Sequence, residues 1–228
     1  MTSWLKFRKK SDYPLGQGLL EATVAIGIIL IGLGGVMALT FQNLAASNDS
    51  VQQIVAMNLA REGIEAVRAI RDSNWLADNN GDPGRVWDFN LQSASSNQAI
   101  LIFDPAVIPA SFALFFLSSP PDSINDNTHP ELNLLRSVQD SDRYVWTQNE
   151  NGSLAGYVST GYRRLLILAP ICKSDASGEI IIEEGQADCN DGYAKIGIKV
   201  ISQVSWLSPR ANEGRKILTV AEAIYNWR

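Results

Sequence analysis

The chain has 228 residues and carries 19 basic and 24 acidic side chains, which give it a formal net charge of −5. Because the footprint of a nucleic-acid-binding protein is basic, this balance argues against such a role, and no nucleic-acid partner is expected. The length is sufficient for one domain of typical size beyond a long helix. The charge does not distinguish between classes of protein partner.

The first predicted element is an apolar helix that follows a basic leader. Residues 19–41 contain a single charged side chain, Glu21, and four Lys and Arg residues lie within residues 6–10. A stretch of about 20 apolar residues is long enough to cross the hydrocarbon core of a bilayer, so the pattern predicts a membrane anchor. The basic leader favours a cytoplasmic N-terminus, and the long C-terminal part is therefore expected outside the cytoplasm. An ionisable residue within such a span is a candidate functional residue.

A secretory signal peptide begins in the same way, but it needs a small-residue cleavage site after the apolar region. Residues 38–46 are compatible with such a site. Residues 51–71, however, continue as a predicted helix that contains no proline and one glycine. This continuation favours a retained anchor over a peptide that is removed.

The start of the helix carries a recognisable motif. The residues Gly16-Gln17-Gly18-Leu19-Leu20-Glu21, after a short basic leader and before an uninterrupted apolar helix, resemble the type IV pilin-like proteins, which include pilus subunits and the pseudopilins of type II secretion. The resemblance implies that a prepilin peptidase cuts after Gly16 and that the new N-terminus, Gln17, is methylated. Glu21 is then the fifth residue of the mature chain, because 21 minus 16 is five.

Two features depart from the pattern of that family. Gln17 stands where phenylalanine or methionine is commoner, and the proline that usually loosens the helix is missing. Since a glycine costs a helix about 1 kcal/mol relative to alanine, glycines near that stretch can supply the same flexibility. These are Gly32, Gly34 and Gly35.

The resemblance also implies a role in assembly for Glu21. In the family, the partner of this carboxylate is the α-amino group of a neighbouring subunit, which here would be that of Gln17. The alternative is that Glu21 simply reaches the headgroup layer, because it lies near the start of the span. The implied partners are prepilin peptidase, other pilin subunits through the N-terminal helix, the inner-membrane assembly machinery, and the membrane before assembly. Removal of residues 1–16, with four positive and one negative side chain, would bring the mature charge to −8, from −5 minus 3.

The predicted helix runs from about Gln17 to about Asp72. Residues 17–41 form its membrane-spanning and polymerisation half, and residues 42–72 form an amphipathic half expected to pack on the chain's own sheet, and in this family also on neighbours. Its apolar positions are Val51, Ile54, Val55, Met57, Leu59, Ile64, Val67 and Ile70. Asn, Asp, Gly and Pro cluster at residues 72–74 and 78–84 and predict a break.

The second cluster, residues 78–84, alternates oxygen-bearing side chains as a calcium loop does. Pro83 and Phe89 stand where such a loop needs glycine and glutamate. The segment is therefore predicted to be a plain turn, and no metal site is expected.

Residues 73–228 are predicted to form a β-rich extracytoplasmic domain. Short apolar runs predict strands, and a polar loop is expected at residues 122–130. His129 lies in that loop without a linked serine or cysteine, so no catalytic role is expected and the chain is not predicted to be an enzyme or to hold a cofactor. The predicted strands before the loop are residues 86–89, 99–103 and 112–117.

The C-terminal third carries a second part of the resemblance. Residues 160–168, 194–207 and 216–220, with the terminal Asn226-Trp227-Arg228, look like the sheet strands of pilus minor subunits of the pilus-modification type. Within residues 194–207, alternate positions are apolar with Ser202 as the polar exception, which supports a strand with one buried face. Trp206 and Trp227 are expected to be packing residues. Residues 178–184 are expected to form an extra hairpin.

Cys172 and Cys189 both lie in the predicted outside domain, where a disulfide can persist. Two thiols in a chain with one histidine make a poor zinc site. A disulfide is favoured, and two free thiols are the remaining alternative.

These patterns predict an α+β, pilin-like fold in which one N-terminal helix packs on an antiparallel sheet. The implied function is that of a structural minor subunit of a type IV pilus or related filament, which is a single-pass membrane protein before assembly and then lies at the cell surface or in a periplasmic filament. A type II secretion minor pseudopilin and a membrane-tethered extracytoplasmic binding module are the alternatives, and a DNA-uptake pilin is disfavoured by the acidic charge. Residues 78–156 match nothing in the family, and any adhesive specificity would be expected to lie there.

Overall fold

A computed structural model describes residues 17–79, 86–94, 96–104, 111–138, 145–183, 185–208 and 214–226. One long helix, α1 (Gln17–Asn79), precedes a set of antiparallel strands, so the predicted α+β class is confirmed. A short 3-10 helix, η1, covers Pro130–Leu132. The strands are β1 (Gln98–Asp104), β2 (Ser111–Phe116), β3 (Asn133–Ser137), β4 (Trp146–Thr147), β5 (Tyr157–Ser174), β6 (Ile180–Ile182), β7 (Tyr193–Leu207) and β8 (Arg215–Tyr225).

The chain divides into two compact units, Met1–Asn48 and Asp49–Arg228. In the described part of the first unit, α1 continues without interruption through Gly32, Gly34 and Gly35. Its large apolar side chains, from Leu19 to Leu44, are exposed. The described part of this unit therefore presents an exposed apolar helix surface.

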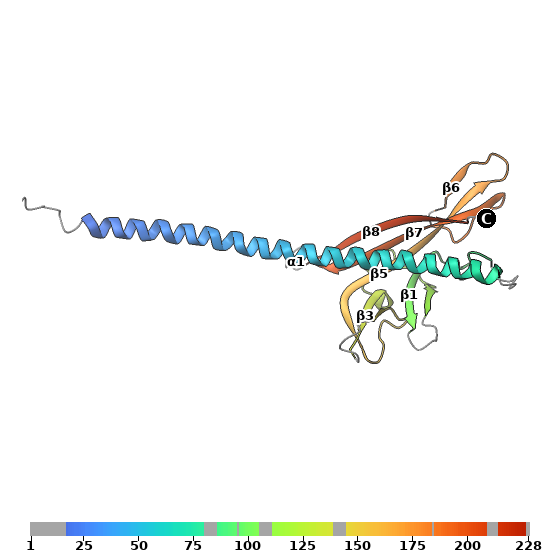
Figure 1. Cartoon of the computed structure of the whole chain (residues 1–228), viewed down its shortest axis with the longest axis horizontal. Coiled ribbons are helices and arrows are strands. Elements are labelled where there is room, and N and C mark those ends of the chain that lie inside the picture. The colour runs from blue at the N-terminus through green and yellow to red at the C-terminus, as the bar shows by residue number, and fades with distance from the viewer. Residues whose placement is uncertain are drawn as a thin grey trace, which may run out of the picture. The chain divides into compact units, whose positions relative to one another are not determined.

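The second unit is a sheet built around the long strand β5. β7 pairs along one side of β5 and β8 pairs with β7, while β3, β1 and β6 pair in turn along the other side of β5. β2 extends the sheet beyond β1, and β4 extends it beyond β3. Within this unit, the second half of α1 lies along the sheet near β5, β7 and β8 (Figure 1).

The main core lies between α1 and the sheet. Ile64 and Val67 of the helix pack against Leu166 of β5 and Val200 of β7, all of them buried. Helix and sheet approach closely at Gly63, where an added Cβ would lie 2.8 Å from the Leu166 side chain and 3.1 Å from the Ser202 hydroxyl.

This close approach explains the polar exception in β7. Ser202 is fully buried, and its small side chain faces the glycine of α1. The predicted alternation is otherwise confirmed from Ile198 onward, because Ile198, Val200, Val204 and Trp206 are buried, whereas Ile196 is half-buried. The expectation that Trp206 is a packing residue is thus also confirmed.

The prediction that the amphipathic half of α1 packs on the sheet is confirmed only in part. Leu59, Ile64 and Val67 are buried in the core, whereas Val51 and Ile54 are largely exposed. The sheet covers the helix from about Val55 onward, so the two earlier apolar positions face outward.

The predicted helix end at Asp72 is wrong, because α1 continues to Asn79. Tertiary contacts override the break signal there. The Asn74 side chain donates hydrogen bonds to the carbonyls of Trp87 and Phe89, at 3.1 and 2.7 Å, and the Arg71 guanidinium lies 4.7 Å from the centre of the Trp75 ring.

The predicted strand at residues 86–89 is also wrong. This segment is a turn, closed by a hydrogen bond from the Phe89 N–H to the Val86 carbonyl at 3.0 Å. Asn90, with a φ of 61°, follows it in the left-handed region, which asparagine tolerates and a continuing strand does not allow.

The other predicted strands are confirmed as parts of β1, β2, β5, β7 and β8, and the extra hairpin is confirmed as β6 paired with β5. The polar loop at residues 122–130 is confirmed up to η1. The turn predicted at residues 78–84 lies mostly outside the described residues, and Asp78 itself belongs to α1. Trp227 also lies outside the described residues.

Candidate functional site

Glu21 lies in the first turns of α1, which begins at Gln17. Its neighbours on the helix are apolar and exposed, including Leu19, Leu20 and Val24. Among the described residues, no side chain pairs with the Glu21 carboxylate, and no other charged residue occurs up to Asn48. The carboxylate is therefore the one formal charge on an otherwise apolar helix surface in the described part of this unit.

The hydroxyl groups of the same segment are satisfied within the helix. Thr23 donates to the Leu20 carbonyl at 2.8 Å, and Thr40 donates to the Val36 carbonyl at 2.9 Å. In the described part of the chain, α1 is the one helix long and apolar enough to cross a membrane. This property fits a single-pass membrane protein.

The structure joins Cys172 and Cys189 in a disulfide with a Cα–Cα distance of 5.7 Å, as predicted. Cys172 is fully buried on β5, and Cys189 lies in the segment between β6 and β7. The β5–β6 hairpin turns at Gly178, whose φ of 70° favours glycine. The bridge thus fixes the segment that follows the extra hairpin to the central strand.

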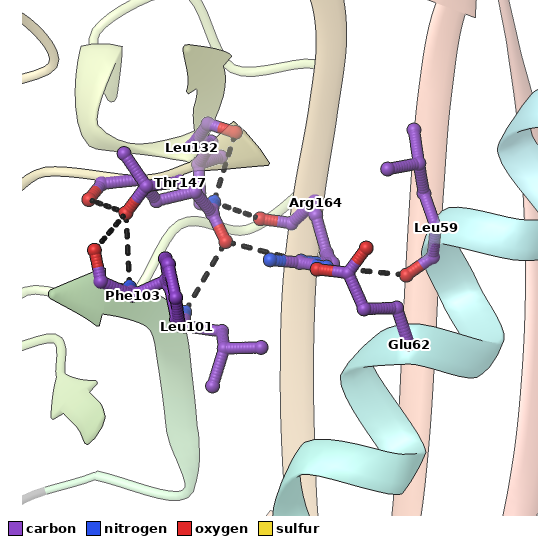
Figure 2. A network of polar contacts seen from close by, with 8 residues as sticks. Leu59, Glu62, Leu101, Phe103, Leu132, Thr147 and Arg164 are labelled. Atoms are coloured by element: carbon purple, nitrogen blue, oxygen red, sulfur yellow. Dashed lines mark hydrogen bonds and ion pairs between the residues drawn. The ribbon is translucent and has the colours of Figure 1, made fainter. Parts of the chain in front are cut away.

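A second polar site, which the sequence analysis did not identify, lies between α1 and the strands (Figure 2). Arg164 of β5 is fully buried. Its guanidinium donates hydrogen bonds to the Leu59 carbonyl, the Glu62 carboxylate and the Gln148 side-chain oxygen, each at 3.2 Å. Burial lowers the pKa of Arg164 from its ordinary value, and Glu62 opposes this shift.

Gln148 extends this network to β1, η1 and β5. Its amide nitrogen donates to the Leu132 carbonyl at 3.0 Å and to the Arg164 carbonyl at 2.7 Å, while its oxygen accepts the Leu101 N–H at 3.2 Å. Each hydrogen-bonding atom of the buried amide therefore has a partner, which a buried polar group requires.

Thr147 performs the same function one step further along β1. Its hydroxyl accepts the Phe103 N–H at 2.9 Å and lies 3.2 Å from the Phe103 carbonyl. β1 pairs with β5 only at Gln98 and Ala99. Beyond that point, the Gln148 side chain accepts the Leu101 N–H, and the Thr147 hydroxyl bonds the Phe103 backbone in place of a neighbouring strand. Figure 2 shows the contact between Thr147 and Phe103.

Charged pairs attach α1 to β8. Lys216 lies 2.6 Å from Asp49, and Arg68 pairs with both Glu65 and Glu222. The hydrogen bond to Glu65 is the main cause that raises the pKa of Arg68. These pairs are partly exposed, so each contributes little beyond about 1 kcal/mol.

His129 has structural partners. Its Nδ1 lies 2.6 Å from a Glu131 oxygen, and its Nε2 lies 3.8 Å from an Asp126 oxygen. The N–H and hydroxyl of Thr128 bond the Asp126 carboxylate and lower its pKa. No group of three or more His, Cys, Asp or Glu side chains in the described segments is arranged to hold a metal ion.

The signal for Arg164 was present in the sequence. Arg164, Leu166 and Leu168 alternate along one strand, so they share a face, and that face is the one that packs on α1. Gln148 gave no comparable signal, because it follows the two-residue strand β4 and acts through a loop.

Comparisons of the chain with protein-family models, with curated proteins and with solved structures gave no match.

Proposed function

We propose that the protein is a structural minor subunit of a type IV pilus or a related secretion filament, assembled through its N-terminal helix. In this proposal, a prepilin peptidase cuts between Gly16 and Gln17, and the new N-terminus is methylated. The protein is a single-pass membrane protein before assembly, and its second unit lies outside the cytoplasm.

The observation that carries the proposal is the single carboxylate on an apolar, uncovered helix surface. A charged side chain in hydrocarbon costs several kcal/mol unless it is paired. Glu21 has no partner among the described residues. An amino group on a neighbouring subunit, formed by cleavage four residues before Glu21, would supply one.

Two further features support a structural role. The helix that carries Glu21 continues into the second unit, where Arg164 and the core attach it to the sheet. A subunit that polymerises through its helix needs such an attachment, because the helix must carry the folded domain into the filament. Val51 and Ile54, in the second unit, are exposed apolar residues of the same helix.

The test is mass spectrometry of the mature protein from cells that contain a prepilin peptidase. The proposal requires the loss of residues 1–16 and a methyl group on Gln17. An intact Met1, or a cut near Ala46, would contradict it and favour a membrane-tethered binding module or a secreted domain.

A matched pair of variants tests the role of Glu21. Glu21→Ala should leave the protein in the membrane fraction and lower its incorporation into sheared filaments by roughly tenfold or more, because a lost charge pair in a low-dielectric medium is worth more than about 1.4 kcal/mol. Thr23→Ala, whose hydroxyl bonds its own helix, is the control and should be incorporated normally. Normal incorporation of Glu21→Ala would refute the pairing.

A further inference from the structure

The β1–β2 hairpin ends in a strand with a free side. β2 pairs with β1 over six consecutive residue pairs from Ala99↔Phe116 to Asp104↔Ser111, without a bulge. In the described part of the chain, no strand pairs with the other side of β2. This side is the outer edge of β2.

The hydrogen-bonding groups of this edge are identified by the register. Leu117 N–H donates to the Gln98 carbonyl at 2.9 Å. Bonded pairs alternate along an antiparallel ladder, so Ala113 and Phe115 bond to β1. The backbone groups of Phe112, Leu114 and Phe116 therefore point away from the sheet and are available to another strand.

The outer edge of β2 lacks the features that usually prevent strand addition. Natural edge strands are protected by charged side chains, prolines, bulges or short length. β2 consists of Ser-Phe-Ala-Leu-Phe-Phe, with no charge and no proline. Phe112 and Phe115 remain 36% and 39% exposed, so an added strand would gain apolar contacts on both faces.

The hairpin is also held in place before any partner binds. Gln148 and Thr147 bond the backbone of Leu101 and Phe103 on the opposite side of β1, and Arg164 connects Gln148 to α1 (Figure 2). A binding edge that is ordered in advance avoids much of the entropic cost of association.

Phe115 of β2 also lines an acidic cleft. A hollow of about 270 Å³ is lined by Phe115 and Leu117 together with His129, Glu131 and Glu150. No Lys or Arg lines it in the described residues. Glu131 is held by His129 at 2.6 Å, whereas Glu150 is exposed. A long side chain on the Phe115 face of an added strand would extend toward the cleft that Phe115 lines.

From this geometry we infer that the outer edge of β2 is a strand-addition site for an extended segment of another protein that carries a lysine or arginine. Backbone bonds to Phe112, Leu114 and Phe116 supply the attachment, as in other cases of β-augmentation. The acidic cleft selects the cation. A second copy of β2 is a poorer occupant, because Ser111–Phe116 contains no basic residue. This inference does not depend on the proposed filament role.

The test uses the full-length chain in nanodiscs of zwitterionic lipid and two capped peptides, Val-Thr-Val-Lys-Val-Thr-Val and the same peptide with glutamate for lysine. The lysine peptide should bind roughly tenfold more tightly, because like charges across an interface are rejected. On its binding, hydrogen exchange of the Phe112, Leu114 and Phe116 amides should slow, while that of Ala113 and Phe115 should not change.

Two variants separate the edge from the cleft. Leu114→Pro removes an outward N–H and should weaken the lysine peptide by roughly tenfold, and its denaturation curve shows whether it is folded. Glu150→Gln removes only a surface charge and should weaken the peptide by about two- to fivefold. The control is Ala221→Pro on β8, whose N–H also points away from its neighbour strand, and it should bind normally.

Equal binding of the two peptides, unchanged binding by both Leu114→Pro and Glu150→Gln, or exchange protection at β8 instead of β2 would overturn the inference. The last test is the oligomeric state of the chain without peptide, measured by sedimentation. A dimer that Leu114→Pro dissociates, without peptide binding, would assign the edge to a second copy and would also overturn it.

Discussion

Replacing Arg164 with alanine tests whether the buried network holds α1 on the strand layer. The substitution removes hydrogen bonds to Leu59, Glu62 and Gln148. Two bonds to neutral acceptors and one to a carboxylate are together worth about 3–5 kcal/mol. Two effects offset part of this loss: the variant has no guanidinium to desolvate, and the Glu62 side chain, which is 38% exposed, can be hydrated instead. The net loss in the free energy of unfolding is therefore about 2–4 kcal/mol.

The assay is unfolding of the full-length protein in detergent by guanidinium chloride, followed by tryptophan fluorescence. The free energy of unfolding should fall by the amount given above, with an unchanged slope against denaturant. Arg68→Ala is the matched control. Its ion pairs with Glu65 and Glu222 are partly exposed, so the loss should stay below about 1 kcal/mol.

A second substitution separates charge from volume. Arg164→Met fills the same space without a buried charge and should cost less than Arg164→Ala, because apolar replacement of a buried ionic group is often neutral. If Arg164→Ala costs no more than Arg68→Ala, the network does not stabilise the attachment of the helix, and the reasoning is refuted.

Three further predictions concern the second unit. Gly63→Ala should lower the free energy of unfolding by roughly 1–2 kcal/mol, because overpacking at 2.8 Å from a leucine methyl of β5 outweighs a gain of about 1 kcal/mol in helix propensity; a stabilised variant would show that the helix can move away. Replacing Cys172 and Cys189 with serine should lower the free energy of unfolding by roughly 3 kcal/mol in the chain-entropy model. The measurement compares denaturant unfolding of this variant with that of the oxidised protein. Asp126→Ala should destabilise at neutral pH but not in acid: the folded-state pKa lies below the unfolded value of 3.8, so this contribution is complete above that value and is lost as the pH falls through the folded-state pKa. The check is thermal unfolding of the wild-type and Asp126→Ala proteins from neutral to acidic pH. If the difference in stability between them does not shrink in acid, Thr128 does not act through the charged carboxylate and the prediction is wrong.

The parts of the fold that sequence patterns predicted are those with strong periodicity. The alternation in β7 fixed its buried face, and the uncharged run after Glu21 predicted the apolar helix. The end of α1 was missed because Asn74 looks like a break in isolation, whereas its side chain bonds the backbone of the turn that follows. Local propensity is a weak prior where such contacts exist.

The residues of the candidate sites also differ in how readily the sequence reveals them. Glu21 and the cysteines were visible because one charge or one pair of thiols is rare in its sequence context. Gln148 was not visible, since a glutamine in a loop has many ordinary roles, and only the three-dimensional structure brings it between Leu101, Leu132 and Arg164.

A buried or lipid-facing charge needs a partner wherever it lies, and under the proposed function the chain would meet this need in two ways. In the second unit, Arg164 finds Glu62 and two further acceptors within its own chain. In the first unit, Glu21 has no cation among the described residues. The energy from pairing Arg164 is therefore present in a single chain at any concentration, whereas that proposed for Glu21 appears only when a second subunit binds. For this reason a substitution at Arg164 should change unfolding of the isolated chain, while a substitution at Glu21 should change assembly alone.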